Sequence, residues 1–190
     1  MINTKFEGPV DVWDHIDMAL MRDRADWEWH PGGRRIHLGA GRKIIQGFDN
    51  VDFPEWDAEW PEKVHPQKWR IPADDGTVGQ IVCQFTLDHL SPEAVVRVLR
   101  EAQRVLMNGG TLDIVVPHYS SQLANECIAH KSRFAIDTWR NIFSERQYAH
   151  DGEEPWLLHI GANFMFGLTE RNLILVTQLI RFEPEEDEDI

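Results

Sequence analysis

The sequence is poor in cysteine and basic residues, and it has no long apolar run. Its two cysteines, Cys83 and Cys127, stand in unrelated contexts, so neither a disulfide framework nor a zinc knuckle is indicated. No apolar stretch approaches the ~20 residues that a membrane-spanning helix needs, and the N-terminus lacks a basic region followed by an apolar core. We therefore expect a soluble, cytoplasmic protein with no membrane partner.

Basic charge is scarce relative to acidic charge. Lys and Arg number 19 against 32 Asp and Glu, which gives a formal net charge of −13. Six of the negative charges belong to the end of the chain: Glu183, Glu185, Glu186, Asp187, Glu188 and Asp189. Non-specific binding to a phosphate backbone relies on clustered Lys and Arg, so the composition does not favour a nucleic-acid partner.

The length and patterning of the chain predict one domain with terminal additions. With 190 residues, 42% of them hydrophobic, the chain can build one full-sized core. Apolar residues recur at helical spacing from Pro9 to Asp26, and an aromatic-rich segment follows. We therefore divide the chain into an N-terminal helical and aromatic extension over 1–33, a domain over 34–182 and an acidic, solvated tail over 183–190.

The segment Arg34–Asp52 organises the rest of the sequence. Ile36–Leu38 is a short run that can enter a sheet, Gly39–Gly41 is a turn with little side-chain bulk, and Val51–Asp52 ends a second run on a carboxylate. Such a turn lets backbone N–H groups approach a ligand, and the carboxylate can accept hydrogen bonds from both ribose hydroxyls. This order predicts a small-molecule site.

The same segment departs from a nicotinamide-binding fingerprint. A strict fingerprint needs a third glycine where this chain has Ile44. Its acid is also expected ~20 residues after the first glycine, whereas Asp52 follows Gly39 more closely. A nicotinamide dehydrogenase is therefore disfavoured.

The middle of the chain predicts a crossover unit. Gln80–Phe85 is an apolar run typical of a buried strand, and Ser91 can cap a helix that continues through Val95–Leu106. We expect Asn108–Gly110 to stop this helix and Thr111–Val116 to form the next strand. A strand, a helix and a strand in this order build a parallel sheet.

The last part of the chain predicts a helix and a hairpin. We expect a helix over Ile136–Gln147 and a long final strand over Leu173–Arg181, with Phe164–Phe166 paired to it. The Trp-rich and Pro-rich segment from Pro54 to Trp69 indicates a short helix and loops.

Five pieces in this order resemble the class I S-adenosylmethionine-dependent methyltransferases, in the small branch often called methyltransferase type 11. They are His37–Gly41, Gly47–Asp52, the turn Ile71–Val78, the Leu-Asp-His-Leu of Leu87–Leu90, and the helix, Gly-Gly turn and strand of Leu99–Pro117. The resemblance implies an α/β fold: a Rossmann-like, doubly wound, mostly parallel sheet of the seven-stranded type with an antiparallel last strand.

The resemblance also implies S-adenosylmethionine as the cofactor. The glycine turn would face its methionine part, the acid after the second strand would hold the ribose hydroxyls, a later segment would border the adenine ring, and the end of the fourth family strand would lie beside the sulfonium methyl. The cofactor-binding residues implied in this way are Gly39, Ala40, Gly41, Asp52, Gln67, Lys68, Gln84 and Phe85.

Two positions depart from the family's pattern. Gln67 stands where many relatives have an acid that accepts from the adenine amino group, and a neutral acceptor is weaker than a charged one. Gly79 stands where the usual motif ends in Phe-Asp. These departures leave open a catalytically degenerate methyltransferase fold that serves as a binding or regulatory protein, beside the active enzyme that we favour.

The stretch after the Thr111–Val116 strand holds the acceptor-side candidates. Ala129–Phe134 resembles an Asp-Pro-x-His-like segment of the family. Methyl transfer to a hydroxyl or amine needs a base, and a histidine of near-neutral pKa can serve. The catalytic candidates are His118 and His130, with His89 third.

The acceptor itself is expected to be small. Lys131 and Arg133 can attract an anionic group in a locally basic pocket, whereas the acidic tail discourages polyanions. A sugar, a metabolite or a natural product fits this balance, so we expect a small-molecule acceptor.

Three alternatives are disfavoured. Cys83 lacks the preceding proline of a cytosine-C5 methyltransferase, and Gln84–Leu87 replaces the Asn-Pro-Pro-Tyr loop of amino-directed DNA methyltransferases. DNA is therefore not the favoured substrate. The nine histidines are scattered along the chain, so we expect no metal site.

Overall fold

The computed structural model describes residues 32–52, 70–144, 155–167 and 169–183. The chain divides into two compact units, Met1–His30 and Pro31–Ile190, and all described residues belong to the second. Within this described part, no helix is both long and apolar enough to cross a membrane.

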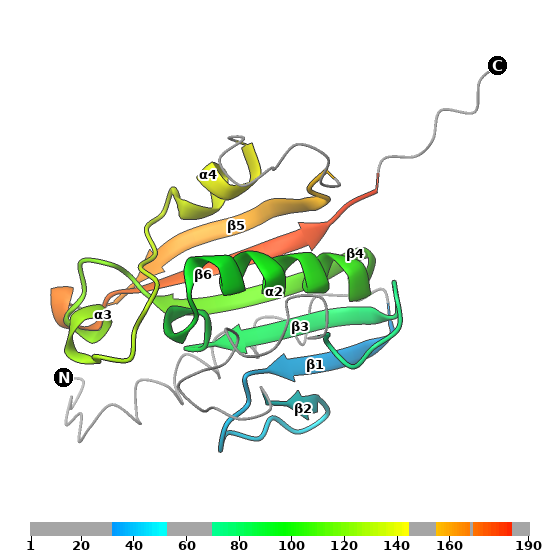
Figure 1. The fold of residues 1–190 in the computed structure, drawn as a ribbon, viewed down its shortest axis with the longest axis horizontal. Helices are drawn as coiled ribbons and strands as arrows, with labels where there is room; N and C mark the ends of the chain where they lie inside the picture. The colour runs from blue at the N-terminus through cyan, green and yellow to red at the C-terminus, as the bar shows by residue number, and fades with distance from the viewer. Residues whose placement is uncertain (1–31, 53–69, 145–154, 168, 184–190) are drawn as a thin grey trace, which may run out of the picture. The chain divides into compact units, whose positions relative to one another are not determined.

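The described residues build a mixed six-stranded sheet in the order β2-β1-β3-β4-β6-β5 (Figure 1). The strands are β1 (Arg34–Leu38), β2 (Asp49–Val51), β3 (Val78–Gln84), β4 (Leu106–Pro117), β5 (Leu158–Phe166) and β6 (Ile174–Arg181). The first four are mutually parallel, and β6 runs antiparallel to both β4 and β5. The predicted parallel strands, the antiparallel last strand and its hairpin are confirmed; a seventh strand is not seen among the described residues.

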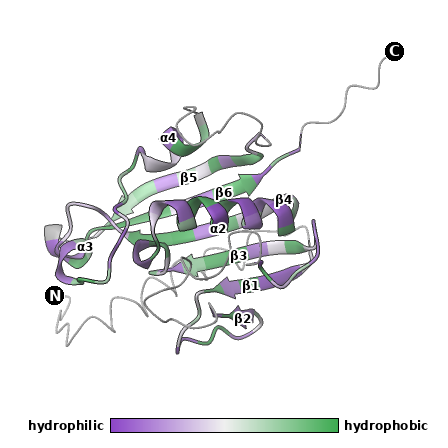
Figure 2. Cartoon of the chain, viewed as in Figure 1, coloured by the Kyte–Doolittle hydropathy of each residue, from purple (hydrophilic) through white to green (hydrophobic). Residues whose placement is uncertain are grey.

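Helix α2 (Pro92–Val105) connects β3 to β4. Its start follows from the sequence, because the Ser91 side chain accepts a hydrogen bond from the backbone N–H of Ala94 and Pro92 stands in the first turn. The helix buries an apolar stripe against the sheet and turns its polar side outward (Figure 2).

The predicted stop of this helix at Asn108–Gly110 is wrong. The helix already ends at Val105, and Asn108–Gly110 lies inside β4. Pairing shifts here, since Val78 lies opposite Leu106 whereas Gln80 lies opposite Thr111. The extra residues form an irregularity in the strand, and Gly109 accommodates it with a positive φ of 80°.

The remaining elements are short: the 3-10 helices η1 (Leu87–His89) and η2 (Glu170–Asn172), and the helices α3 (Gln122–Glu126) and α4 (Thr138–Ser144). The helix predicted over 136–147 is therefore shorter at its start, and its last residues lie outside the described part of the chain. The predictions for the N-terminal extension, for 54–69 and for the acidic tail beyond Glu183 also lie outside the described residues.

The two faces of the sheet differ in chemistry. One face carries the apolar core with α2, including Ile36, Ile81 and Leu112. On the alternate positions a line of polar side chains crosses four strands: Arg35 Nε donates to Gln80, and the amides of Gln80 and Gln178 both donate to the buried Asp113 carboxylate. These bonds satisfy polar groups that would otherwise be costly to bury.

Gly79 has a packing reason that the sequence did not reveal. A Cβ atom at position 79 would overlap the backbone carbonyl oxygen of Gly32, which passes beside β3. The departure from the family's motif at this position therefore follows from local backbone packing at the beginning of β3, away from the strand's carboxyl end.

Candidate functional site

The predicted cofactor-side and acceptor-side residues follow the carboxyl ends of neighbouring strands. The Gly39–Gly41 turn follows β1, Asp52 follows β2, Phe85 follows β3 and His118 follows β4. Because these four strands are parallel, the residues share one edge of the sheet (Figure 1). Ligands of open α/β sheets bind outside this edge.

The glycine turn is fixed to both neighbouring strands. The N–H groups of Gly39 and Ala40 donate to the carbonyl of Val51, at 2.8 and 3.3 Å. Gly39 has a φ of 75°, and a Cβ atom there would overlap the Thr86 side chain. Gly41 has a φ of 50° and open space where a Cβ atom would lie. The turn therefore has open space beside Gly41, whereas the N–H groups of Gly39 and Ala40 already donate hydrogen bonds to the protein backbone.

Asn50 builds the loop that leads to the acid. Its carboxamide accepts from the N–H of Ile45 at 2.9 Å and donates to the carbonyls of Ile45 and Phe48, both at 3.0 Å. The same side chain lies 3.1 Å from Nδ1 of His37, whose pKa is lowered by burial. Asp52 is exposed directly after this organised segment. Asn50 is part of the Gly47–Asp52 family motif, but its position in the sequence did not indicate this role.

The end of β3 holds an unusual backbone conformation. Phe85 has a φ of 49°, the single positive value for a non-glycine residue among those described. Its N–H donates to the carbonyl of Val115 at 2.8 Å, and Lys43 Nζ donates to the Gln84 side chain at 3.4 Å. Positive φ at a bulky residue is strained, and such strain clusters at functional sites.

His118 begins the loop after β4 and is only 7% exposed. Its Nδ1 lies 2.8 Å from the Ser120 hydroxyl and accepts from the Ser120 N–H at 3.4 Å. A backbone N–H can only donate, so Nδ1 carries the lone pair and Nε2 carries the proton of the neutral ring. Burial lowers the pKa of His118, which keeps the ring neutral near pH 7.

His130 lies on the same loop in a different environment. Its Nδ1 donates to the carbonyl of Ala124 at 3.1 Å, and its Nε2 lies 3.0 Å from Oδ2 of Asp88. The Asp88 carboxylate raises the pKa of His130 against the effect of burial. The pKa values of His118 and His130 are therefore shifted in opposite directions, and the two rings have separate partners.

The loop is held on η1 by backbone contacts. The carbonyl of Asp88 accepts from the N–H groups of Lys131 and Ser132, at 2.8 and 3.1 Å, and the Ser132 hydroxyl donates to the carbonyl of Leu90 at 2.7 Å. Sequence reasoning gave Asp88 no role beyond its place in the family motif. The match of Leu87–Leu90 to the family's Leu-Glu-His-Leu motif was the one feature of the sequence that drew attention to Asp88.

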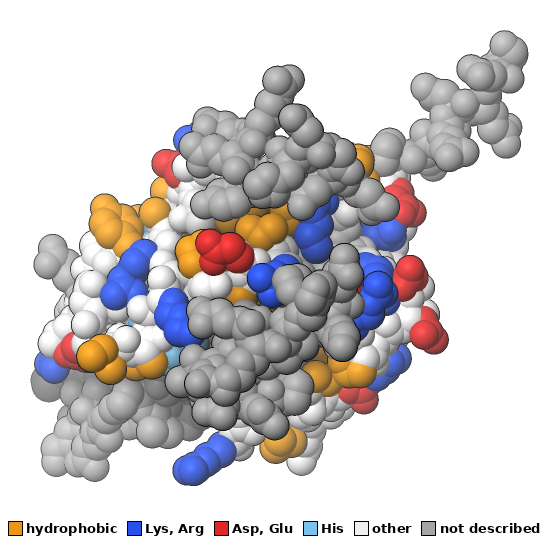
Figure 3. Space-filling model, viewed as in Figure 1, with side chains coloured by type: hydrophobic (Ala, Val, Ile, Leu, Met, Phe, Trp, Pro, Cys, Tyr) orange, Lys and Arg blue, Asp and Glu red, His pale blue; other side chains and the backbone are white. Residues whose placement is uncertain are grey.

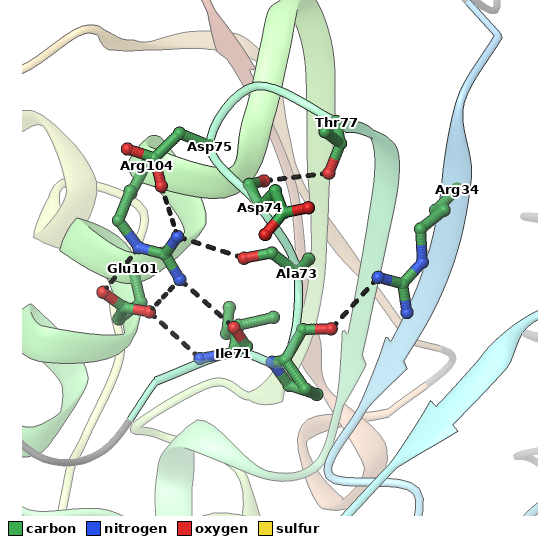
Figure 4. A network of polar contacts seen from close by, with 9 residues as sticks. Arg34, Ile71, Ala73, Asp74, Asp75, Thr77, Glu101 and Arg104 are labelled. Carbon is green, nitrogen blue, oxygen red and sulfur yellow. Dashed lines mark hydrogen bonds and ion pairs between the residues drawn. The ribbon is translucent and has the colours of Figure 1, made fainter.

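A separate polar cluster lies at the opposite edge of the sheet (Figure 4). Arg104 at the end of α2 donates to Asp75, to both carboxylate oxygens of Glu101 and to the carbonyls of Ile71 and Ala73. These bonds fix the turn of residues 71–77 that enters β3. A cavity of about 780 Å³ adjoins this cluster. Since the charges there pair with one another, we assign the cluster to folding.

Comparisons with known proteins place the fold. No protein-family model and no curated protein matches the sequence. Solved structures do match: the YcgJ protein of Bacillus subtilis has 15% identity and a TM-score of 0.56, covering 90% of this chain and 100% of its own. An S-adenosylmethionine-dependent methyltransferase from Mesorhizobium loti has 15% identity and a TM-score of 0.54. The match covers 87% of this chain and 97% of that protein. The chain has the class I S-adenosylmethionine-dependent methyltransferase fold.

A third solved structure with this methyltransferase fold contains a ligand. The N-methyltransferase NodS from Bradyrhizobium japonicum, in complex with S-adenosylhomocysteine, has 10% identity and a TM-score of 0.54, covering 94% of this chain and 90% of its own. The predicted fold is therefore confirmed. Of the residues assigned to the cofactor, Gln67 and Lys68 lie outside the described part of the chain, and the other six lie at one edge of the sheet.

Proposed function

We propose that this protein binds S-adenosylmethionine at the carboxyl edge of β1, β2 and β3 and transfers its methyl group to a small acceptor. The observation that carries the proposal is the convergence of the Gly39–Gly41 turn, Asp52 and Gln84–Phe85 at this edge, within a methyltransferase fold. Support also comes from the solved structures above, which include one methyltransferase named as S-adenosylmethionine-dependent and one in complex with S-adenosylhomocysteine.

The described residues fit the cofactor. Gly41 leaves open space beside the turn, and the exposed Asp52 carboxylate offers two acceptors for ribose hydroxyls. Phe85, held with positive φ, would border the reactive group. S-adenosylmethionine supplies an electrophilic methyl group on a sulfonium, so the protein must align an acceptor and remove its proton.

We assign proton removal to the Ser120–His118 pair. Ser120 is exposed, and its hydroxyl lies 2.8 Å from Nδ1 of His118. Because Nδ1 carries the lone pair, the hydroxyl donates this hydrogen bond. An acceptor hydroxyl or amine would give its proton to the Ser120 oxygen while the Ser120 proton passes to Nδ1. With the cofactor bound, the acceptor would take the methyl group as the sulfonium–methyl bond breaks, and the imidazole of His118 would hold the acceptor's proton.

His130 has a positioning role in this proposal. Its two ring nitrogens lie against the carbonyl of Ala124 and the carboxylate of Asp88, so the ring anchors the loop that begins at His118. Lys131 and Arg133 are exposed on this loop and would attract an anionic group on the acceptor.

The charge pattern supports a small acceptor over a nucleic acid. Figure 3 shows Lys and Arg side chains interspersed with Asp and Glu on the face that it draws, without one dominant basic patch. The formal net charge of −13 adds long-range repulsion for a polyanion. A small molecule can instead respond to local charges on the loop.

The test is formation of S-adenosylhomocysteine from S-adenosylmethionine in the presence of small hydroxyl, amine and carboxylate compounds, with duplex DNA and RNA as comparison substrates. We expect product with a small acceptor only. His118→Ala and Ser120→Ala should each lower kcat by about 10²–10⁴-fold, the usual contribution of general acid–base catalysis. His159→Ala, on the exposed part of β5, is the matched control. Full rates in both loop variants, with cofactor affinity unchanged, would reject the assigned pair.

A further inference from the structure

The fold brings together three side chains that are far apart in the sequence. One donor atom from each of His89, Cys127 and His130 lies within 4.8 Å of the other two. The two imidazole rings meet edge to face, with centroids 4.7 Å apart. His89 belongs to η1 and the other two belong to the loop after β4, so the cluster joins two segments at the carboxyl edge.

A buried carboxylate adjoins this cluster. Asp88 is 2% exposed, and neither of its carboxylate oxygens has a hydrogen-bond partner among the described residues. Its Oδ2 lies 3.0 Å from Nε2 of His130 and 3.9 Å from Nε2 of His89. The short approach to His130 is not aligned as a hydrogen bond. An unsatisfied buried carboxylate is costly, so the arrangement calls for a cation that is shared between these atoms.

His130 is oriented as a metal ligand. Its Nδ1–H donates to the carbonyl of Ala124, which leaves the lone pair of the neutral ring on Nε2, facing Asp88. Metal-bound histidines commonly donate their other ring N–H to a backbone carbonyl in this way. A lone pair and a carboxylate oxygen that face each other repel unless a proton or a metal ion lies between them.

We propose that the clustered side chains of His89, Cys127 and His130 bind one zinc ion, with the Asp88 carboxylate beside the two imidazoles as a fourth ligand. Ligands of a tetrahedral zinc ion, with Zn–N and Zn–O distances of about 2.1 Å, lie about 3.4 Å from one another. The separations of 3.0 and 3.9 Å from Oδ2 of Asp88 bracket this value. A thiolate with two imidazoles favours zinc over magnesium or calcium, which prefer oxygen ligands.

With Asp88 as the fourth ligand the site would be closed and structural. The ion would tie η1, which follows β3, to the loop that carries His118 and Ser120. None of its ligands is among the residues that we assign to the cofactor, although Asp88 and His89 follow the same strand as Gln84 and Phe85. The earlier expectation of no metal site rested on scattered positions in the sequence, and folding brings two of those histidines into contact.

The first experiment is titration of the chelator-treated protein with Zn²⁺ by calorimetry and with Co²⁺ by absorption spectroscopy. We expect one ion per chain, a tetrahedral cobalt spectrum and a thiolate-to-cobalt charge-transfer band. Cys127→Ser should abolish that band, and Cys127→Ser and His130→Gln should each weaken Zn²⁺ binding at least tenfold. His159→Ala should retain full affinity. Equal affinity in wild type, Cys127→Ser and His130→Gln, or a cobalt spectrum without the thiolate band, would overturn the proposal.

The second experiment uses the contrast between the two cysteines. Cys83 is fully buried and burial raises its pKa to about 12, so it should not react with iodoacetamide at pH 8 in the folded protein. Cys127 is partly exposed and should be alkylated in the metal-free protein. Stoichiometric Zn²⁺ should slow this reaction at least tenfold, whereas Mg²⁺ should not. An unchanged rate of Cys127 alkylation with Zn²⁺ would contradict a thiolate ligand. Both experiments are read without S-adenosylmethionine, so they succeed or fail independently of the proposed methyl transfer.

Discussion

The backbone of Gly39 lies so close to Thr86 that a Cβ atom at position 39 would overlap the Thr86 methyl and hydroxyl groups. Thr86 also donates from its hydroxyl to the carbonyl of Gln84 at 2.9 Å and to that of Gly39 at 3.4 Å. The turn after β1 and the segment after β3 therefore pack as one unit. This contact sets the position of the two segments that we assign to the cofactor.

Gly39→Ala should destabilise the protein and weaken cofactor binding. A Cβ atom there meets both a positive φ of 75° and the Thr86 side chain. A left-handed conformation costs about 1–2 kcal/mol and overpacking about 1–3 kcal/mol, so the free energy of unfolding should fall by about 2–5 kcal/mol. Gly41→Ala is the matched control, because its φ is also positive but its surroundings are open. Urea unfolding measures the free energy of unfolding of the two variants. Equal losses in Gly39→Ala and Gly41→Ala would contradict the close packing on Thr86.

Arg104→Lys should destabilise the protein although it keeps the charge. Lysine cannot reproduce the planar fork that donates to Glu101, Asp75 and two backbone carbonyls. We expect a loss of about 1–3 kcal/mol, the scale of hydrogen bonds to charged groups. Arg97→Lys, at a partly exposed position on the same helix, is the control and should change the free energy of unfolding by less than about 0.5 kcal/mol. A loss no larger in Arg104→Lys than in Arg97→Lys would show that the cluster is not structural.

His118 should make the folded protein less stable as the pH falls. Burial lowers its pKa in the folded state below the ordinary value of about 6.5, so the unfolded chain takes up the proton first. The contribution of His118 to the free energy of unfolding is constant above pH ~6.5. It is lost as the pH falls from about 6.5 through the lower pKa of the folded state. His118→Asn should therefore lose less stability than wild type between pH 7 and 5. An NMR titration midpoint for His118 at or above 6.5 would contradict this account.

The parallel part of the fold was predictable because local signals coincided with tertiary ones. Ser91 and Pro92 start α2 as their capping chemistry requires, and the apolar run of β3 is buried along its whole length. The start of β4 was not predictable, since Asn108–Gly110 reads as a helix stop and is instead an irregularity set by pairing with β3. Strand pairing overrode the local turn signal there.

The candidate site was predictable where it depends on strand order and not where it depends on loop packing. Parallel strands necessarily bring Gly39, Asp52 and Phe85 to one edge. By contrast, the pairing of Asp88 with His130 depends on how the loop after β4 folds back onto η1, and no sequence spacing encodes that contact. The same holds for Cys127, whose neighbours are imidazoles from two segments.

The most direct test of the central claim is calorimetric titration with S-adenosylhomocysteine of wild type, Asp52→Ala and Asp49→Ala. Asp49 is the matched control because it is a neighbouring acid on β2 that pairs with Arg34 at 2.9 Å. Wild type and Asp49→Ala should bind one ligand per chain with similar affinity. Asp52→Ala should bind more weakly by about 1.5–3 kcal/mol, the usual value of a hydrogen bond to a charged group. Absence of binding to wild type, or equal affinity in folded Asp52→Ala, would contradict a cofactor site at this edge of the sheet.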